Sequence, residues 1–172
     1  LASGMWKSGD LTLYIDIGTN GEIVLGNDQW LVCASYSAGP AFEGGGIRSG
    51  MRAGAGAIEQ ITIHRVTLEP MIMTIGKTKP AGICGSGLID CVSEMIESGL
   101  IDRRGRFVRE KRTERVREGV DGFEYVLCFA PETSVDRDIV LTEADLENLL
   151  RTKAALYAGC RTLLKEVGSD FG

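Results

Sequence analysis

The 172-residue sequence has a single histidine, His64, and five widely spaced cysteines without a CxxC pair. A Ser-His-Asp catalytic arrangement therefore has little support, because it needs its histidine beside a nucleophile and a carboxylate. Cysteines this far apart form neither a metal-binding knuckle nor a disulfide framework. We therefore expect reduced, mostly buried thiols in a cytoplasmic protein, and no iron–sulphur cluster bound by this segment alone.

The sequence also has no apolar run near the ~20 residues that a membrane span needs, and no signal-peptide pattern opens it. Its formal charge is −5, with 44% hydrophobic and 25% charged residues. An acidic chain of this kind is not typical of nucleic-acid or membrane-surface proteins, so neither partner is expected. The apolar content is sufficient for a folded core.

Glycine is abundant, with 23 residues in 172, nearly twice the usual ~7%. The glycines gather in three segments, 18–26, 39–56 and 82–87. This clustering indicates special backbone sites rather than a flexible linker.

The first half of the sequence predicts strands. Residues 11–17 alternate between apolar and polar side chains, which is the period of a strand. Asn20 and Gly21 predict a hairpin turn, because both tolerate a positive φ. Further strands are predicted at 23–25, 30–35, 61–68, 70–75 and 125–129.

Two helices are predicted. The first follows Gly85-Ser86-Gly87, with Ser86 as its N-cap and Gly99 at its end. Its predicted apolar stripe consists of Leu88, Ile89, Val92, Met95 and Ile96. The second helix starts at Thr142, forms a near capping box with Asp145 and closes at Gly168. Strands followed by helices with strands between them indicate a layered α/β fold.

The segment from Asp16 to Glu22 is the first candidate site. A tight turn with small side chains lets successive backbone N–H groups converge on a phosphate. Asp16 could hold a hydrated magnesium ion beside that phosphate. The alternative is a well-formed hairpin in which Asp16 satisfies only its own turn.

The segment Gly82–Gly87 is the second candidate. Glycines before a helix leave its first N–H groups open to an anion, which the helix dipole favours. The alternative is that these glycines allow helix and sheet to pack closely. For the glycines of 44–46, close packing is the favoured interpretation.

The run from Asp102 to Glu118 contains eight basic and four acidic residues, which gives a local charge of +4 in an acidic chain. Its only aromatic residue is Phe107, so stacking on nucleic acid is not favoured. The run predicts a solvated hairpin or a docking patch for an acidic protein partner.

Several of these segments together resemble one protein family. Leu13–Leu25 resembles the second phosphate motif of the actin, hexokinase and heat-shock chaperone (ASKHA) superfamily. More narrowly, the chain is similar to the C-terminal domain of the ferredoxin-like reductive activators of corrinoid-dependent methyltransferases. The segments that carry this resemblance are 38–45, 50–53, 56–59, 82–87 and 142–159. The resemblance runs from about residue 10 to the end and is interrupted at the charge run.

The resemblance implies an ATP-driven electron donor. In such proteins a 2Fe–2S ferredoxin domain supplies a low-potential electron, and the ATP-binding domain drives its transfer to a Co(II) corrinoid protein, which returns to Co(I). It implies ATP and magnesium as cofactors of the parent protein. The 2Fe–2S cluster is expected in an N-terminal part that these residues do not include.

The resemblance also implies site residues. Asp16, with magnesium held through water, would face the nucleotide phosphates together with Gly18, Thr19, Asn20 and Gly21. Gly85, Ser86 and Gly87 resemble the nucleotide-contacting turn of 2-hydroxyacyl-CoA dehydratase activators. Glu147 and Arg151 are similar in position to residues at the adenosine edge of heat-shock chaperones. No catalytic residue is predicted.

We therefore expect residues 1–172 to be a single partial domain, one lobe of an actin-like ATPase domain. The lobe would be α/β, with a ribonuclease-H-like mixed sheet, flanking helices and an inserted loop or hairpin at 102–118. Its partners would be the remaining lobe, the ferredoxin domain and the corrinoid protein, and the isolated chain would be inactive. Two alternatives remain open: a lobe of a phosphotransferase or small-molecule kinase on the same fold, and a non-enzymatic docking module.

Overall fold

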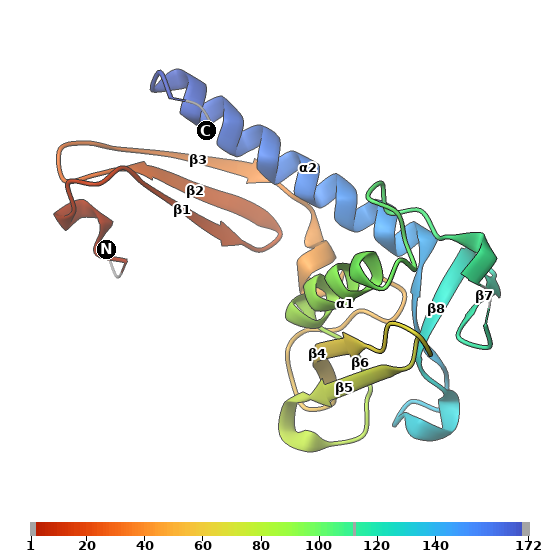
Figure 1. Ribbon diagram of the computed structural model, residues 1–172. Helices are drawn as coiled ribbons and strands as arrows, with labels where there is room; N and C mark the ends of the chain where they lie inside the picture. The colour runs from red at the N-terminus through yellow and green to blue at the C-terminus, as the bar shows by residue number, and fades with distance from the viewer. Residues whose placement is uncertain (1–2, 112, 170–172) are drawn as a thin grey trace. The chain divides into compact units, whose positions relative to one another are not determined.

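The computed structural model of the chain describes residues 3–111 and 113–169, which form two compact units (Figure 1). The first unit combines Leu1–Gly39 with Arg151–Gly172, and the second is Pro40–Leu150. Each unit has its own cluster of buried apolar side chains. Each therefore has its own hydrophobic core.

The first unit is an antiparallel sheet with a helix on one face (Figure 1). A short 3-10 helix, η1 (Met5–Lys7), precedes three strands in the order β1 (Thr12–Ile17), β2 (Asn20–Gly26) and β3 (Leu31–Ser37). Ile23 and Leu25 of β2 pack against Cys160, Leu163 and Leu164 in the last part of helix α2 (Glu143–Glu166). The first three predicted strands are confirmed.

The turn between β1 and β2 differs from the prediction. Gly18 and Thr19 form it, and the Gly18 N–H donates to the Asn20 carbonyl at 2.9 Å. Neither Asn20 nor Gly21 has a positive φ, so the predicted Asn-Gly turn is wrong. Gly21 is needed for another reason, because a Cβ atom there would collide with the side chain of Leu156 on α2.

The second unit contains two more three-stranded sheets and helix α1. One sheet has the order β5-β4-β6, with β4 antiparallel to β5 and parallel to β6, and the other is the antiparallel sheet β7-β8-β9. The bounds are η2 (Pro40–Glu43), β4 (Ala57–Ile63), β5 (Pro70–Thr74), η3 (Ile75–Lys77), β6 (Gly82–Ile83), α1 (Gly85–Glu97), η4 (Arg109–Lys111), β7 (Val116–Gly119), β8 (Gly122–Cys128), η5 (Ala130–Glu132) and β9 (Ile139–Thr142). The predicted α/β class is confirmed, with a mixed sheet as one of three small sheets.

Helix α1 packs against β4. Leu88, Cys91 and Met95 are fully buried on the packed face, whereas Ile89 and Ile96 are 55% and 41% exposed. The predicted apolar stripe was therefore partly wrong, because Ile89 and Ile96 lie off the packed face and Cys91, which was not predicted, lies on it.

The prediction for the start of α1 is wrong, and the prediction for its end is confirmed. Its N-cap is Cys84 and no side chain caps the first turn. Ser86 is the second helical residue, so the prediction that Ser86 caps the helix is wrong. At the other end, Ser98 is the C-cap and Gly99 follows with φ 69°. This left-handed conformation is the reason for a glycine there.

The start of α2 is fixed by the predicted capping box. The Thr142 N–H donates to Asp145 Oδ2 at 2.9 Å, and the Asp145 N–H donates to Thr142 Oγ1 at 3.1 Å. Asp145 Oδ1 accepts a further bond, from the N–H of Arg48 at 2.9 Å. Asp145 therefore connects the helix start to a segment nearly one hundred residues earlier.

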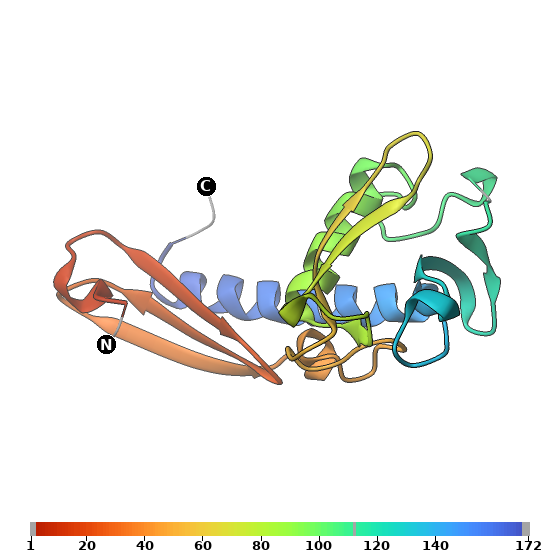
Figure 2. The same ribbon diagram turned by 90° about the horizontal axis from the view of Figure 1, so that it is seen from below.

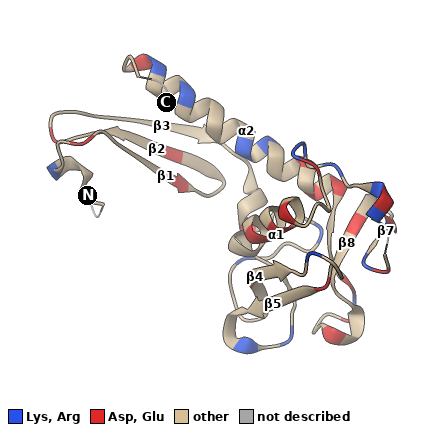
Figure 3. Ribbon diagram, viewed as in Figure 1, with Lys and Arg blue, Asp and Glu red and all other residues tan. Residues whose placement is uncertain are grey.

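The basic run begins as an ordered loop. An antiparallel bridge joins Ile101 to Phe107, and Asp102 Oδ1 accepts the N–H groups of Arg104 and Arg106 at 2.8 and 2.9 Å. These contacts present exposed arginines on the segment between α1 and β7 (Figure 3). Position 112 of the run lies outside the described residues.

Candidate nucleotide-binding site

The tip of the β1–β2 hairpin carries the first group of predicted site residues. Asp16 is the last but one residue of β1, Thr19 lies in the turn, and Asn20 begins β2. The Thr19 carbonyl accepts the N–H groups of Ala38 and Gly39 at 3.2 and 2.9 Å. These bonds attach the tip to the residues after β3, while the side chains of Asp16 and Asn20 are exposed.

Asp16 has a second carboxylate directly opposite it. The hairpin register pairs Asp16 with Glu22, and residues paired in this way project from the same face of the sheet. Like charges opposite each other destabilise a hairpin, whereas a divalent cation prefers carboxylate oxygens. Glu22 also accepts a hydrogen bond from Ser35 Oγ at 3.4 Å. Glu22 was not predicted as a site residue, although its hairpin pairing is the signal that would have identified it.

The second group, Gly85–Gly87, forms the first turn of α1. The first N–H groups of an α-helix have no partner within the helix, and the dipole makes this end positive. No acidic side chain lies in the first turn of α1, and Ser86 is exposed. The geometry is therefore compatible with an anion at this helix end.

The same glycines also have a packing role. A Cβ atom at Gly85 would collide with the carbonyl oxygen of Phe42, and one at Gly87 with that of Ile58. Cys84, just before them, is buried, and its thiol donates to the Ile58 carbonyl at 3.3 Å. Both interpretations of these glycines are thus compatible with the structure.

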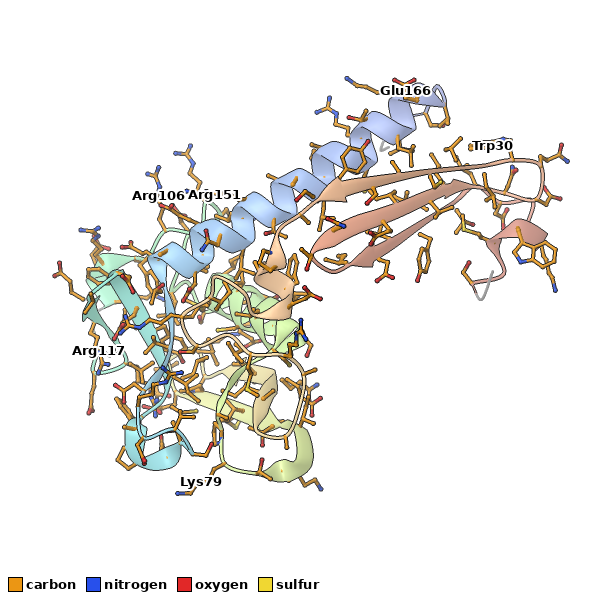
Figure 4. All side chains as sticks on the ribbon, turned by 180° about the vertical axis from the view of Figure 1, so that it is seen from behind. Trp30, Lys79, Arg106, Arg117, Arg151 and Glu166 are labelled. Atoms are coloured by element: carbon orange, nitrogen blue, oxygen red, sulfur yellow. The ribbon has the colours of Figure 1, made fainter. Side chains whose placement is uncertain are left out.

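Glu147 and Arg151 lie one turn apart on α2, and both are exposed. Glu147 lines a hollow of about 610 Å³ with Glu143 and three arginines of the basic run, Arg104, Arg106 and Arg109. Figure 4 shows the Arg106 side chain extending away from the ribbon. The wall of the hollow carries cationic and anionic groups together with the apolar side chains of Phe107 and Leu150.

The predicted site residues are divided between the two units. Asp16–Gly21 and Arg151 belong to the first unit, whereas Gly85–Gly87 and Glu147 belong to the second. The first glycine motif therefore lies at the tip of a hairpin in the first unit, and the second lies at the start of a helix in the second unit.

An ion-pair network around the buried Glu124 in the second unit was not predicted. Glu124, whose side chain is 6% exposed, pairs with Arg117 Nε at 2.9 Å and Arg48 Nη1 at 3.5 Å. Arg117 Nη2 also pairs with Asp138 Oδ2 at 2.6 Å. Partial burial opposes ionisation of Asp138, but the bonds from Arg117 and from the Ala130 N–H at 2.8 Å together lower the pKa of that carboxyl. Arg117 lies directly opposite Glu124 in the β7–β8 hairpin, so the hairpin register could have revealed this pair. Arg48 belongs to a segment far away in the sequence, and no local pattern could reveal its pair with Glu124.

Comparison with known proteins identifies the family. Residues 10–172 match the C-terminal domain of RACo, the ASKHA domain. The chain belongs to this family. The actin-like fold class and the family predicted from the shared segments are thereby confirmed.

Two curated relatives of this ASKHA domain are named for corrinoid activation or reduction. The chain is 36% identical to the corrinoid activation enzyme RamQ of Eubacterium limosum, over 96% of the chain and 29% of that protein. It is 28% identical to a [Co(II) methylated amine-specific corrinoid protein] reductase of Methanosarcina barkeri, over 93% of the chain and 29% of that protein.

A solved structure is more similar still. The reductive activator for corrinoid,iron-sulfur protein superposes with a TM-score of 0.92 at 52% sequence identity, over 98% of this chain and 27% of that protein. The ASKHA chain thus spans less than a third of the length of each of these relatives.

The five cysteines of this ASKHA domain are free, and four of them, Cys84, Cys91, Cys128 and Cys160, are buried. Within residues 3–111 and 113–169, no group of three or more His, Cys, Asp or Glu side chains could hold a metal ion. Burial raises the pKa of the Cys91 thiol and raises that of Cys128 to about 12. Both thiols are therefore protonated near neutral pH, whereas the thiolate is the metal ligand.

In the part of the chain that the structure describes, neither α1 nor α2 has the length and apolar character of a membrane-crossing helix.

Proposed function

We propose that this chain is the nucleotide-binding lobe of an ATP-dependent reductive activator that returns Co(II) corrinoid proteins to Co(I). The observation that supports it best is the family match over residues 10–172, together with relatives named for corrinoid activation. The partner of the full-length protein would be a corrinoid protein, and its compartment the cytoplasm.

In this proposal the β1–β2 hairpin binds the nucleotide phosphates. Gly18, Thr19, Asn20 and Gly21 lie at or beside the turn, where backbone N–H groups and short polar side chains can approach an anion. Asp16 would hold Mg²⁺ through water, because magnesium loses its own waters reluctantly. The exposed position of Asp16 leaves room for that hydration shell.

The remaining predicted residues would hold the rest of the nucleotide. Gly85, Ser86 and Gly87 offer the open, positive end of α1 to a phosphate. Glu147 and Arg151 would contact the adenosine edge, and the hollow beside Glu147 is large enough for a small ligand.

The chain would act as one part of a longer protein. The 2Fe–2S cluster would be held by a ferredoxin domain outside residues 1–172, as the resemblance to ferredoxin-like activators implies. A second lobe outside these residues would complete the phosphate site. Residues 1–172 would then form a single partial domain, and the chain alone would turn over no ATP.

The experiment that tests this function is the substitution Asp16→Ala in the full-length protein. ATP-dependent conversion of the corrinoid from Co(II) to Co(I), followed by its visible absorption, should be lost. Thermal unfolding should change little, because Asp16 is an exposed strand residue and such substitutions typically shift stability by less than ~0.5 kcal/mol.

A matched control is Asp10→Ala, which removes an exposed carboxylate of the same unit outside the hairpin tip. This variant should reduce the corrinoid at the wild-type rate. Equal activity of the Asp16 and Asp10 variants would remove Asp16 from the mechanism.

A further inference from the structure

The second unit contains a hollow that the proposed nucleotide site does not use. Three segments form its wall: the residues before β4, the β7–β8 hairpin, and the loop that leads into β9. Figure 2 shows the last two, in teal and cyan, together at one end of the unit. The volume is about 280 Å³, and we call it the arginine hollow. Its lining residues are Arg48, Ser49, Arg117, Glu124, Arg137, Asp138 and Val140.

The two carboxylates of the arginine hollow already serve as acceptors. Glu124 accepts Arg117 Nε at 2.9 Å with one oxygen and Arg48 Nη1 at 3.5 Å with the other. Asp138 accepts Arg117 Nη2 at 2.6 Å and the Ala130 N–H at 2.8 Å, again with different oxygens. Each carboxylate oxygen therefore has a donor within the protein.

The three guanidinium groups, in contrast, keep most of their donors. A guanidinium has five N–H groups in a planar fork and no acceptor. Arg117 uses Nε and Nη2, and Arg48 uses Nη1. Within the described residues, the side chain of Arg137 has no hydrogen-bond or ion-pair partner. The arginine hollow thus offers several N–H donors to a ligand and few acceptors.

Ser49 adds a donor from a buried position. The residue is 7% exposed, and its Oγ accepts the N–H of Val140 at 3.0 Å. Because a serine hydroxyl both accepts and donates, its O–H hydrogen remains available to a group in the hollow. Arg117 is held in place by its ion pairs with Glu124 and Asp138. Donors that are positioned before binding lose little side-chain freedom when a ligand arrives.

The charge of the wall indicates the charge of the ligand. Three arginines face two carboxylates, which leaves an excess of one positive charge. Asp121 pairs with Arg48 at 3.2 Å but does not line the hollow, and its side chain is 51% exposed. Water therefore screens its charge. A group with a single negative charge would balance the wall.

We propose that the arginine hollow binds a small organic molecule through one carboxylate group, at a site separate from the nucleotide site. The guanidinium fork of Arg137 matches the two oxygens of a carboxylate, and Arg48 and Ser49 would donate to the same group. A phosphate monoester carries about −1.5 to −2 near pH 7 and would exceed the charge of the wall. Pockets for drug-sized ligands have ~300–1,000 Å³, so the ligand of this hollow is smaller.

Titration of the full-length protein with acetate, followed by saturation-transfer NMR, tests the proposal. Acetamide is the matched probe, because it has the shape of acetate without the charge. Acetate should bind saturably with a Kd of ~10 mM or less, and acetamide at least ~10-fold more weakly, because it lacks the charge-assisted bonds. Inorganic phosphate should displace acetate only at a higher concentration than unlabelled acetate does. The absence of saturable acetate binding up to ~100 mM, equal binding of acetamide, or displacement by phosphate at a lower concentration would overturn the proposal.

Arg137→Gln assigns the acetate binding to the arginine hollow. Arg137 is exposed and bonds to no other described side chain, so Tm should stay unchanged while acetate affinity falls ~10-fold or more. The control Arg161→Gln removes an exposed arginine of the first unit and should leave acetate affinity within ~2-fold of wild type, because a charge outside the site is screened.

ATP binding separates this site from the nucleotide site. Both variants should bind ATP like the wild type, because neither Arg137 nor Arg161 is a predicted nucleotide residue. Wild-type acetate affinity in Arg137→Gln, or equal losses in the two variants, would contradict binding in the arginine hollow. Loss of ATP binding in Arg137→Gln alone would contradict a separate site.

Discussion

Asp145 provides a quantitative test of how the second unit is held together. Its carboxylate is 2% exposed and accepts two backbone bonds, from Thr142 and from Arg48. Asp145→Ala leaves both N–H groups without an acceptor. Bonds to charged groups are worth ~1.5–3 kcal/mol each, so we expect a loss of ~3–6 kcal/mol of unfolding free energy. That is a large share of the 5–15 kcal/mol typical of a domain.

Two further substitutions make the test specific. Asp145→Asn keeps one carbonyl acceptor and should lose about half as much free energy as Asp145→Ala. Glu166→Ala removes an exposed carboxylate from the other end of α2 and should change stability by less than ~0.5 kcal/mol. Urea unfolding gives the change in unfolding free energy for the three variants, provided that the dependence of free energy on urea concentration has the same slope in each. A loss below ~1 kcal/mol for Asp145→Ala would refute the argument that these two bonds hold the helix start.

The basic run and the ion-pair network give two more predictions. Replacing Arg103, Arg104 and Arg106, all exposed, by Glu should slow association with an acidic corrinoid protein by ~10-fold or more at low salt and less at 0.15 M. An unchanged association rate at low salt would exclude the docking patch and leave the solvated hairpin as the interpretation of the basic run. Arg117 and the Ala130 N–H together lower the pKa of Asp138 against the effect of burial. The contribution of Asp138 to stability is therefore present above the unfolded pKa of ~3.9 and is lost as pH falls through the lower folded value. Asp138→Asn should weaken the fall of unfolding free energy at acid pH. An unchanged pH dependence would contradict the contribution of Asp138 to stability.

The elements that could be predicted are those specified by local pattern. Alternation gave the strands of the first hairpin, and Thr142 with Asp145 gave the start of α2, because a capping box involves residues three apart. The failed prediction of an Asn20-Gly21 turn used a glycine that a distant contact requires. Gly21 has no side chain because Leu156, more than a hundred residues later, occupies the space. No local pattern contains that information.

The candidate site shows the same limit. The motif around Asp16 and the glycines before α1 could be found from the sequence, because each is continuous. Glu22 could have been added from the hairpin pairing with Asp16. The pair of Glu124 with Arg48, in contrast, depends on how separate segments fold together.

The central claim is that these residues form one part of a two-part ATP site. Calorimetric titration with ATP and Mg²⁺ of the full-length protein and of residues 1–172 alone tests it most directly. Losing the partner lobe removes at least two charge-assisted bonds of ~1.5–3 kcal/mol each, which weakens binding ~100-fold or more at ~1.4 kcal/mol per decade. We therefore predict saturable binding by the full-length protein and at least ~100-fold weaker binding by the isolated chain. Equal affinity of the two, or no binding by the full-length protein, would contradict the account.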